Sequence, residues 1–312
     1  MERAQRLLAD LRRNIERVFV GKPEAVSNVL IALLARGHVL IEDMPGVGKT
    51  ILARSLAMSI DCSFNRVQLT PDLLPSDIIG VSIFSERSQS FEFVKGPIFT
   101  HVLLADEINR TTPRTQAALL ESMSESQVSV DGRTYLLERP FMVVATQNPH
   151  DFEGTYFLPE SQLDRFTIRL SIGYPAREFE RTILRSQPGT NVLPGLKPVM
   201  HRDDVVALQD AAAAVQMDDA LVDYILQIAS RTRDHDMLQA GVSPRGSLAL
   251  SRAAQAAALL DGRDYVIPDD IKNLVIPVFA HRVTGKSYMQ DGQLAETENI
   301  LRAILEETAV PT

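Results

Sequence analysis

The sequence predicts an α/β fold with a parallel sheet, followed by a helical region. Three apolar segments, at 39–41, 101–107 and 141–146, run into polar residues, as strands buried on both faces of a parallel sheet do. Segments with helical spacing separate them. A stretch rich in proline and glycine at 186–200 marks a boundary, and only helical spacing follows it.

The composition is that of a globular protein with 312 residues and a net charge of −8. This length suits about two domains, and the negative charge argues against a protein that relies on contacts with nucleic-acid phosphates.

The longest apolar stretch, 29–35, falls short of the roughly 20 residues of a membrane span. Residues 1–10 show no signal peptide. We therefore expect a cytoplasmic protein without membrane insertion. Cys62 is the only cysteine, which excludes an internal disulfide.

The N-terminal region is expected to contain two helices. Residues 4–19 carry apolar side chains on one helical face, namely Leu7, Leu8, Leu11, Ile15, Val18 and Phe19. A turn at 20–23 follows, and a second helix runs to about residue 36. This helix leads into the first strand, at 39–41.

The first strand is followed by the loop M-P-G-V-G-K-T at 44–50 and then by a helix. Gly46 and Gly48 lack a Cβ atom, so the backbone can turn its N–H groups toward phosphate oxygens. Lys49 can reach the terminal phosphates of a nucleotide, and the Thr50 hydroxyl can bind Mg²⁺. The predicted nucleotide-binding residues are Pro45, Gly46, Val47, Gly48, Lys49, Thr50 and Ile51.

Asp43 departs from the general phosphate-loop pattern, which has glycine at this position. A carboxylate close to a triphosphate would be repelled. We therefore expect the Asp43 side chain to point away from the phosphates or to cap the turn.

A strand at 64–69, a helix at 71–80 and two β-hairpins are predicted next. Alternating apolar residues flank a polar tip at 85–90 in the first hairpin, and flank Asp131-Gly132 in the second. Spacing alone leaves open whether these are surface hairpins without a role.

Asp106 and Glu107 end the second buried strand. In an open parallel sheet, ligands bind at the carboxyl ends of the strands. Asp106 can hold Mg²⁺, and Glu107 can orient or deprotonate the water that attacks the γ-phosphate. Two acids at this position can also cap the next helix, but the phosphate loop upstream favours the catalytic role.

Asn148 follows the third buried strand, and Arg165 lies within the segment L-P-E-S-Q-L-D-R-F. The Asn148 amide could position the attacking water, or it could be a turn residue before proline. Arg165 by itself suggests a surface ion pair.

The C-terminal region is expected to contain five helices. Two cover 202–216 and 218–231, and a third starts with Ser243 as N-cap and Pro244 as first residue. Two more begin near Asp269 and Asp291, the former bent or interrupted at Pro277. The histidines at 101, 150, 201, 235 and 281 lack the spacing of metal ligands.

The blocks MPGVGKT, LLADEINR, ATQNP, LPESQLDRF and GVSPRGSLAL resemble the MoxR family of AAA+ ATPases, and the match runs from about 20 to 282. The resemblance implies an αβα sandwich with a parallel sheet, followed by a small all-helical lid. The nucleotide-binding domain, with two inserted hairpins, would cover 1–187, a linker 188–200 and the lid 201–312.

The resemblance also implies roles for single residues. Lys49 and Thr50 belong to Walker A, and Asp106 and Glu107 to Walker B. Further catalytic roles fall on Asn148 as sensor 1, Arg165 as the arginine finger for a neighbouring subunit, and Arg245 as sensor 2. We expect Arg245 to couple lid closure to the nucleotide of its own subunit. The two hairpins would be the helix-2 insert and the pre-sensor insert, facing the centre of a ring.

The function implied is a ring homo-oligomer, a hexamer, that hydrolyses ATP with Mg²⁺ for chaperone-like remodelling of protein complexes. A protein with a von Willebrand factor A domain is an implied partner. One alternative is a nucleic-acid motor, but the hairpin tips S-E-R-S-Q-S and D-G-R carry balanced charge, whereas a motor needs several cations there. The other is a nucleotide-gated scaffold, against which Glu107 argues.

Overall fold

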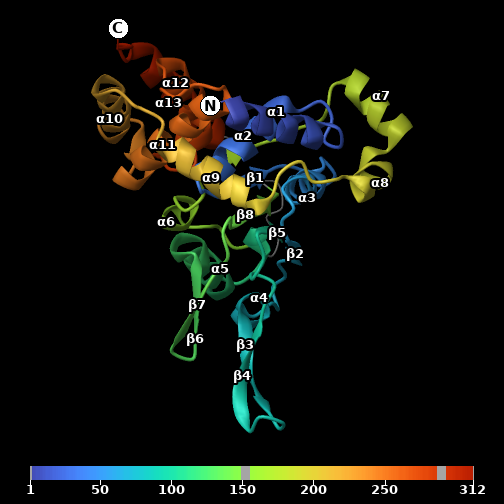
Figure 1. The fold of residues 1–312 in the computed structure, drawn as a ribbon. Helices are drawn as coiled ribbons and strands as arrows, with labels where there is room; N and C mark the ends of the chain where they lie inside the picture. Colours follow the sequence, from blue (N-terminus) through green and yellow to red (C-terminus); the bar gives the residue numbers. More distant parts are fainter. Residues whose placement is uncertain (1, 149–154, 287–292, 312) are drawn as a thin grey trace.

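A computed structural model of the protein describes residues 2–148, 155–286 and 293–311. Its centre is a sheet of five parallel strands in the order β2-β5-β8-β1-β9 (Figure 1). The strands are β1 (Val39–Glu42), β2 (Phe64–Gln68), β5 (Val102–Asp106), β8 (Met142–Gln147) and β9 (Ile168–Leu170). Because all pairings are parallel, the carboxyl ends of the strands meet at one edge. The predicted α/β fold with a parallel sheet is confirmed.

Alternate residues of the central strands enter two different cores. Ile41, Leu104 and Val144 join one core, and Leu40, Leu103 and Val143 join the other. The first core lies under α1 (Glu2–Glu16), α2 (Pro23–Leu34) and α3 (Lys49–Ser59), and the second includes residues of α5 (Pro113–Glu125). The sheet is therefore the middle layer of an αβα sandwich, as predicted.

The helix expected at 71–80 is shorter than the spacing suggested. In the structure α4 covers Pro75–Ile79. Pro75 occupies the first turn, and the Asp77 carboxylate accepts the Leu74 N–H at 2.8 Å. These two features begin the helix at Pro75, so the residues before it form a turn.

Both predicted hairpins are present. The first pairs β3 (Gly80–Ser85) with β4 (Ser90–Lys95), and the second pairs β6 (Gln127–Val130) with β7 (Arg133–Leu136). Asp131 and Gly132 have φ of +50° and +72°, as the tight turn that matches strand twist requires. Figure 1 shows both hairpins projecting the same way from the body. The rings of Phe93 and Tyr135 stack at 4.2 Å between them.

The stretch predicted as a linker is ordered and packed. It follows α7 (Arg177–Ser186) and holds α8 (Pro188–Asn191) and a 3₁₀ turn, η2 (Leu193–Gly195). Leu193 and Leu196 are buried in a small cluster with Val18. The proposed domain boundaries at 187 and 200 remain a prediction.

The C-terminal region is helical apart from a short antiparallel pair, β10 (Leu238–Ala240) with β11 (Thr284–Gly285), which the sequence analysis did not foresee. Its helices are α9 (Arg202–Ala213), α10 (Asp219–Arg233), α11 (Pro244–Leu260), α12 (Pro268–Phe279) and α13 (Gln293–Glu307). Ser243 caps α11, as predicted, whereas Pro277 does not interrupt its helix, because α12 continues past it to Phe279. Asp291, predicted to begin the last helix, lies outside the described residues.

The lid helices share a core with the N-terminal helices. Buried residues of α1 and α2 belong to the same apolar cluster as those of α9 to α13, and Gln209 on α9 donates to the Leu33 carbonyl of α2 at 2.7 Å. The lid therefore packs against the nucleotide-binding part over a broad surface. Within the described ranges, no helix has both the length and the apolarity needed to cross a membrane.

His38, just before β1, is a buried link between the sheet and α5. Its Nδ1 accepts the Val143 N–H at 3.0 Å, and its Nε2 lies 3.0 Å from the Met123 carbonyl. Burial lowers the pKa of His38 to about 4, which the bond to Met123 opposes and the Arg245 charge reinforces. The imidazole is therefore neutral in the folded protein at pH 7.

We predict that His38 makes folding sensitive to acid. Because its pKa is 6.5 unfolded and about 4 folded, its contribution is fully present above pH 6.5 and is lost as the pH falls through 4. The loss amounts to about 3 kcal/mol. Denaturant unfolding of His38→Gln between these pH values should show a smaller decrease than the wild type. His201→Gln, at an exposed histidine, should show the wild-type slope, and an equal slope in both variants would contradict the prediction.

Candidate functional site: the carboxyl edge of the sheet

The phosphate loop leaves β1 at the carboxyl edge and opens α3. Gly46 and Gly48 have φ of +88° and +96°, a backbone region that side chains with a Cβ rarely adopt. Gly48 is the N-cap of α3 and supplies no side-chain bond to the N–H groups of the first turn. These N–H groups and the helix dipole form an anion-binding end. The loop thus has the geometry that the sequence predicted.

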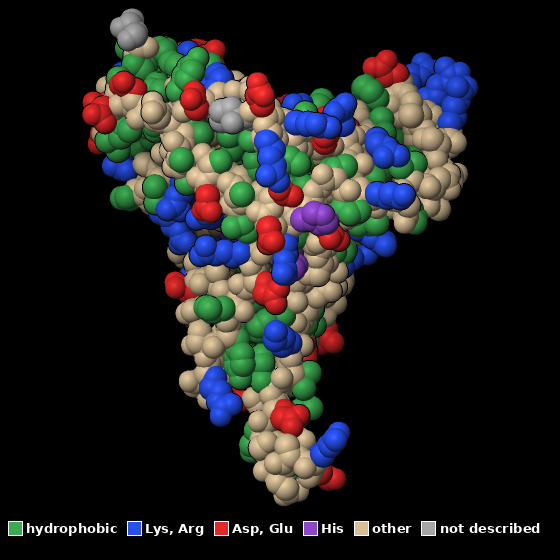
Figure 2. Space-filling view, in the orientation of Figure 1, with side chains coloured by type: hydrophobic (Ala, Val, Ile, Leu, Met, Phe, Trp, Pro, Cys, Tyr) green, Lys and Arg blue, Asp and Glu red, His purple; other side chains and the backbone are tan. Residues whose placement is uncertain are grey.

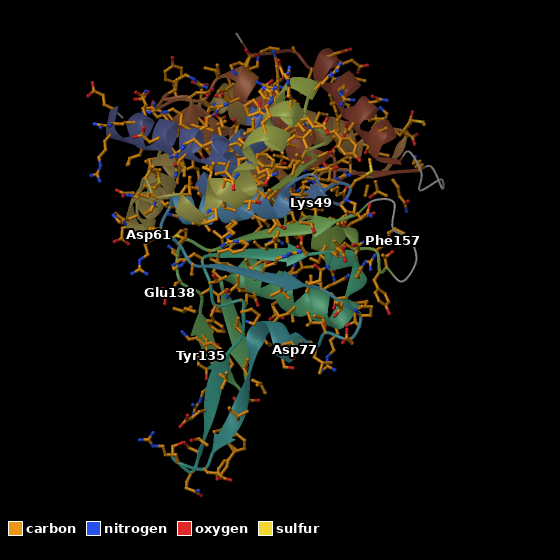
Figure 3. The ribbon with its side chains drawn as sticks, turned by 90° about the vertical axis from the view of Figure 1, so that its right-hand side faces the viewer. Lys49, Asp61, Asp77, Tyr135, Glu138 and Phe157 are labelled. Atoms are coloured by element: carbon orange, nitrogen blue, oxygen red, sulfur yellow. The ribbon has the colours of Figure 1, made fainter. Side chains whose placement is uncertain are left out.

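Lys49 begins α3 and lies between the sheet and the helices (Figure 3). Its Nζ donates to the Asp43 backbone carbonyl at 2.5 Å. Burial lowers the pKa of Lys49, and the charges of Asp43, Asp106, Glu107 and Glu42 oppose this shift. Four acids therefore act on one ammonium group.

The Asp43 carboxylate caps the turn beside the phosphate loop, as predicted. Oδ2 accepts the N–H groups of Ile172 and Gly173, each at 2.6 Å, and the Ser171 hydroxyl at 3.1 Å, while Oδ1 accepts the Met44 N–H at 2.8 Å. Burial raises the pKa of Asp43, but these hydrogen bonds outweigh burial and hold it below its usual value. The loop is therefore anchored to the chain after β9 by an ionised side chain.

Asp106 ends β5 and is buried. Its Oδ2 accepts Arg66 Nε at 2.6 Å, and its Oδ1 accepts the Thr146 hydroxyl at 3.0 Å. The same Thr146 oxygen accepts the Glu107 N–H at 3.0 Å. Thr146 thus links both acids to β8.

Glu107 has a left-handed backbone, with φ of +58° and ψ of +53°. Its Oε2 accepts Gln68 Nε2 at 2.7 Å and lies 3.2 Å from Arg110 Nε. A non-glycine residue in this region is strained, and such strain is found at functional sites. Gln68 and Arg110 thus hold one oxygen of the Glu107 carboxylate.

A divalent cation fits the oxygen groups at this edge. The Thr50 hydroxyl follows Lys49 on α3, and the Asp106 carboxylate has about four lone-pair positions, two of which are used by Arg66 and Thr146. Hydroxyl and carboxylate oxygens are ligands that Mg²⁺ prefers. Among the residues described, no cluster of three or more His, Cys, Asp or Glu side chains could hold a metal ion. His150 lies outside the described residues.

Asn148 follows β8 at the same edge. The preceding Gln147 donates to Glu42 Oε1 at 2.5 Å, and Glu42 pairs with Arg169 on β9. These contacts tie the ends of β1, β8 and β9 together. They fix the backbone that carries Asn148 beside the phosphate loop.

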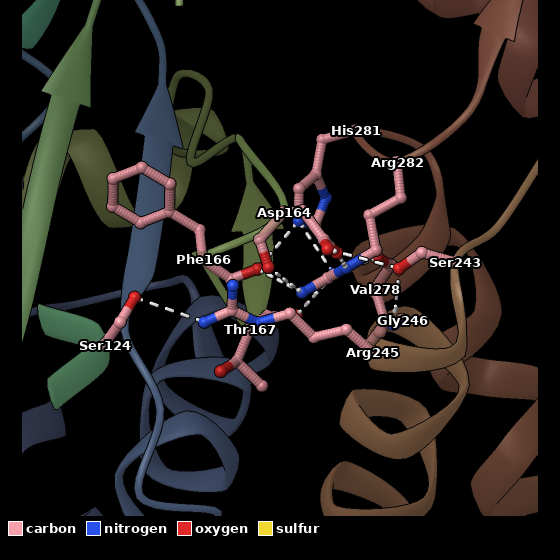
Figure 4. Close-up of polar contacts among 10 residues, drawn as sticks. All are labelled: Ser124, Asp164, Phe166, Thr167, Ser243, Arg245, Gly246, Val278, His281 and Arg282. Carbon is pink, nitrogen blue, oxygen red and sulfur yellow. Dashed lines mark hydrogen bonds and ion pairs between the residues drawn. The ribbon is translucent and has the colours of Figure 1, made fainter. Parts of the chain in front are cut away.

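Arg165 and Arg245 lie next to each other, away from the carboxyl edge of the sheet. Arg165 Nη1 donates to the Leu120 carbonyl at 2.6 Å and to Ser124 Oγ at 3.1 Å. Arg245 Nη2 donates to the same Ser124 Oγ at 3.2 Å (Figure 4). Ser124 is near the end of α5, one residue after Met123, the partner of His38. The two arginines are thus at the amino edge of the sheet.

In this structure Arg245 does not lie beside the phosphate loop of its own chain. His38 precedes β1 and the phosphate loop follows it, and the strand separates the two by roughly 16 Å at about 3.3 Å per residue. Arg245 lies on the His38 side, where its charge acts on His38. The reason is the packing of the lid, because α11 lies against α2 and α9 rather than over the loop.

Several polar residues at the carboxyl edge escaped the sequence analysis, among them Arg66, Gln68, Arg110 and Thr146. Gln68 and Thr146 lie at strand ends, where the rule for parallel sheets could have indicated them. Arg66 had no such signal, since it meets Asp106 only after folding. Arg110 lies three residues after Glu107, and that spacing could have indicated their pairing.

The fold and the loop together define a nucleotide-binding protein of the phosphate-loop class with a helical lid. Residues 38–168 match the family described as "ATPase family associated with various cellular activities (AAA)", and residues 230–304 match the AAA lid domain.

Individual relatives cover nearly the whole chain. The uncharacterized protein YeaC of Bacillus subtilis is 49% identical over 305 residues, which are 98% of this chain and 95% of that one. Chaperone MoxR1 of Mycobacterium tuberculosis is 40% identical over 306 residues, 95% of this chain and 80% of that one. A crystal structure from Cytophaga hutchinsonii, provisionally described as an ATPase, is 34% identical with a TM-score of 0.90, covering 99% of this chain and 96% of that one. The chain belongs to the MoxR family of AAA+ ATPases.

We predict that Asp43→Ala destabilises the protein by about 3 kcal/mol, because it leaves the Ile172 and Gly173 N–H groups without their charged acceptor. Denaturant unfolding measures this change. Asp223→Ala, at an exposed carboxylate of α10, is the matched control and should unfold like the wild type. Unchanged stability of Asp43→Ala would contradict the anchoring role.

Proposed function

We propose that the protein hydrolyses ATP with Mg²⁺ in a ring of identical subunits, a hexamer, and uses this cycle for chaperone-like remodelling or activation of protein complexes. The observation that carries this proposal is the separation of two sets of residues. The phosphate loop and the acids lie at one edge of the sheet, and Arg165 and Arg245 lie at the other. Such an arrangement suits a site that two neighbouring subunits complete.

The carboxyl edge supplies the first part of the site. The N–H groups around Gly46 and Gly48 bind phosphate oxygens, and Lys49 releases the Asp43 carbonyl to neutralise the β- and γ-phosphates. Thr50 and Asp106 would hold Mg²⁺, which would supply positive charge beside the phosphates. Glu107 turns from Gln68 and Arg110 to orient the attacking water and accept its proton. Asn148 holds the same water or the γ-phosphate.

The amino edge of the next subunit supplies the second part. Arg165 and Arg245 release Ser124 and place their guanidinium groups on the γ-phosphate of the neighbour, where a planar fork of donors stabilises the transition state. The Nε atom of Arg165 is buried without a hydrogen-bond partner in the described chain, and a buried group of this kind is uncommon. Both arginines thus act between subunits, which revises the role expected for Arg245.

The hairpins are the proposed contact with client proteins. Their exposed apolar side chains include Val81, Ile83, Phe84, Phe91 and Leu136, and Figure 2 shows the longer hairpin extending from the body. Apolar side chains with balanced charges favour a protein over a nucleic acid as the bound molecule. A client or cofactor protein with a von Willebrand factor A domain, and a cytoplasmic location, complete the proposal.

We predict that ATP turnover depends on assembly. Turnover per subunit should rise with protein concentration, and Lys49→Ala should abolish it. Arg165→Ala should lower it by about 10³-fold while nucleotide binding persists, because an arginine finger acts on the transition state. Steady-state phosphate release and nucleotide binding are the measurements.

The matched control is Arg6→Ala, at an exposed arginine of α1, which should keep wild-type turnover. Turnover that is independent of concentration and survives the loss of Arg165 would show a site complete within one chain. The ring mechanism would then be wrong.

A further inference from the structure

Arg282 is a buried charge that the proposed mechanism does not use. Its side chain is 2% exposed. Burial lowers its pKa to about 10, and the Asp164 carboxylate opposes this shift. Burying an arginine is costly even when it is paired, and an apolar replacement is often as stable. Stability alone therefore does not account for Arg282.

The Arg282 guanidinium donates hydrogen bonds to the chain on both sides of Arg165. Nε donates to Asp164 Oδ1 at 2.7 Å, and Nη2 donates to the carbonyls of Asp164 at 3.1 Å and Phe166 at 2.6 Å. Nη1 donates to the Thr167 carbonyl at 3.2 Å. These acceptors precede and follow Arg165 in the chain (Figure 4). One side chain from the lid thus fixes the segment that carries Arg165.

The same cluster reaches the helix that carries Arg245. The second oxygen of Asp164, Oδ2, accepts the hydroxyl of Ser243, the N-cap of α11, at 3.2 Å. A Cβ atom at Gly246 would lie 2.9 Å from Arg282 Cδ, so the first turn of α11 packs directly on the Arg282 side chain. Arg245 lies in that turn.

The two arginines need such support because their charges repel each other. Arg165 and Arg245 both donate to Ser124 Oγ, so two guanidinium groups lie close together. Asp164 and Arg282 contact the residues that flank both arginines in the chain. The cluster is therefore placed to hold the pair in one geometry.

We propose that Arg282, with Asp164, is a positioning residue that joins the lid to the segment of Arg165, so that Arg165 and Arg245 reach the nucleotide of the neighbouring subunit as one rigid unit. The inference rests on the shared site proposed above. It implies that the lid and the arginine pair move together when the neighbouring site closes.

The test is the variant Arg282→Lys, which keeps the charge and its pairing with Asp164 but cannot bridge the three carbonyls. ATP turnover of the pure variant should fall by roughly 10²-fold, as when a catalytic group moves by about 1 Å. Nucleotide binding should stay at the wild-type level, because the phosphate loop is unchanged. Retained wild-type turnover would overturn the inference.

Mixed assemblies distinguish positioning from general damage. Lys49→Ala subunits have intact arginines but no working loop, and Arg165→Ala subunits have the reverse. In an equal mixture, about one contact between subunits in four should regain turnover. Each contact joins the phosphate loop of one subunit to the arginines of the next, and each of these is intact in half of the subunits. Arg282→Lys should recover turnover with Lys49→Ala subunits and not with Arg165→Ala subunits. Loss that Lys49→Ala subunits do not restore would indicate a merely structural role and overturn the inference.

Two further variants complete the experiment. Arg263→Lys alters another arginine–aspartate pair of the lid, in which Arg263 bonds Asp270 at 2.6 and 2.7 Å, and should keep wild-type turnover. An equal loss there would overturn the inference. Ser243→Gly cuts the link from Asp164 to α11 without touching Arg282, and glycine is a tolerated N-cap residue. If Arg282→Lys does not fold, Ser243→Gly should still lower turnover and be restored by Lys49→Ala subunits, and wild-type behaviour would overturn the inference.

The reference mixture separates the two proposals. If Lys49→Ala and Arg165→Ala subunits regain no turnover together, the shared site itself is wrong, and the inference falls with it. If they regain turnover and Arg282→Lys does not behave as predicted, only the inference is wrong.

Discussion

The parallel sheet is the constraint on which the rest of the structure depends. Because all five strands run the same way, every carboxyl end meets at one edge and every amino end at the other. The phosphate loop, Asp106, Glu107 and Asn148 follow strands and so meet at the carboxyl edge. Arg165 precedes β9 and lies at the amino edge. A strand is rigid and cannot shorten, so no local motion within one chain brings Arg165 to Lys49.

Polar contacts between strand ends make the carboxyl edge a single unit. Thr146 joins Asp106 to Glu107, and Glu42 joins Gln147 to Arg169. Asp43 fastens the phosphate loop to the chain after β9. Each of these contacts fixes a strand end against a neighbouring segment of the chain.

Features fixed by neighbouring residues could be predicted from the sequence. The phosphate loop, the buried strands and the Asp131-Gly132 turn each depend on a few consecutive residues, and the structure has them. The family resemblance supplied the sandwich and the lid. The extent of α4 was wrong because a proline and a capping carboxylate, Pro75 and Asp77, decide where it begins. Asp43 could be assigned a cap, but its partners at 171–173 are remote in sequence.

The features that the sequence did not indicate depend on packing between residues far apart in the chain. The placement of Arg245 depends on where α11 packs, and burial against α2 and α9 decides this. Gln68, Arg66 and Arg282 each meet their partners only in the folded chain, and an isolated arginine in a helical region is indistinguishable from a surface residue. The role of Arg282 follows from its burial and from the carbonyls around Arg165, and neither is visible in the sequence.

The central claim is that two subunits complete one nucleotide site. The most direct measurement is a structure of the assembled Glu107→Gln protein with ATP and Mg²⁺, in which hydrolysis is blocked. The account predicts that Arg165 and Arg245 have left Ser124 and contact the γ-phosphate bound to Lys49 of the adjacent subunit. Arginines that remain on Ser124 beside an ATP molecule enclosed by one chain would contradict it.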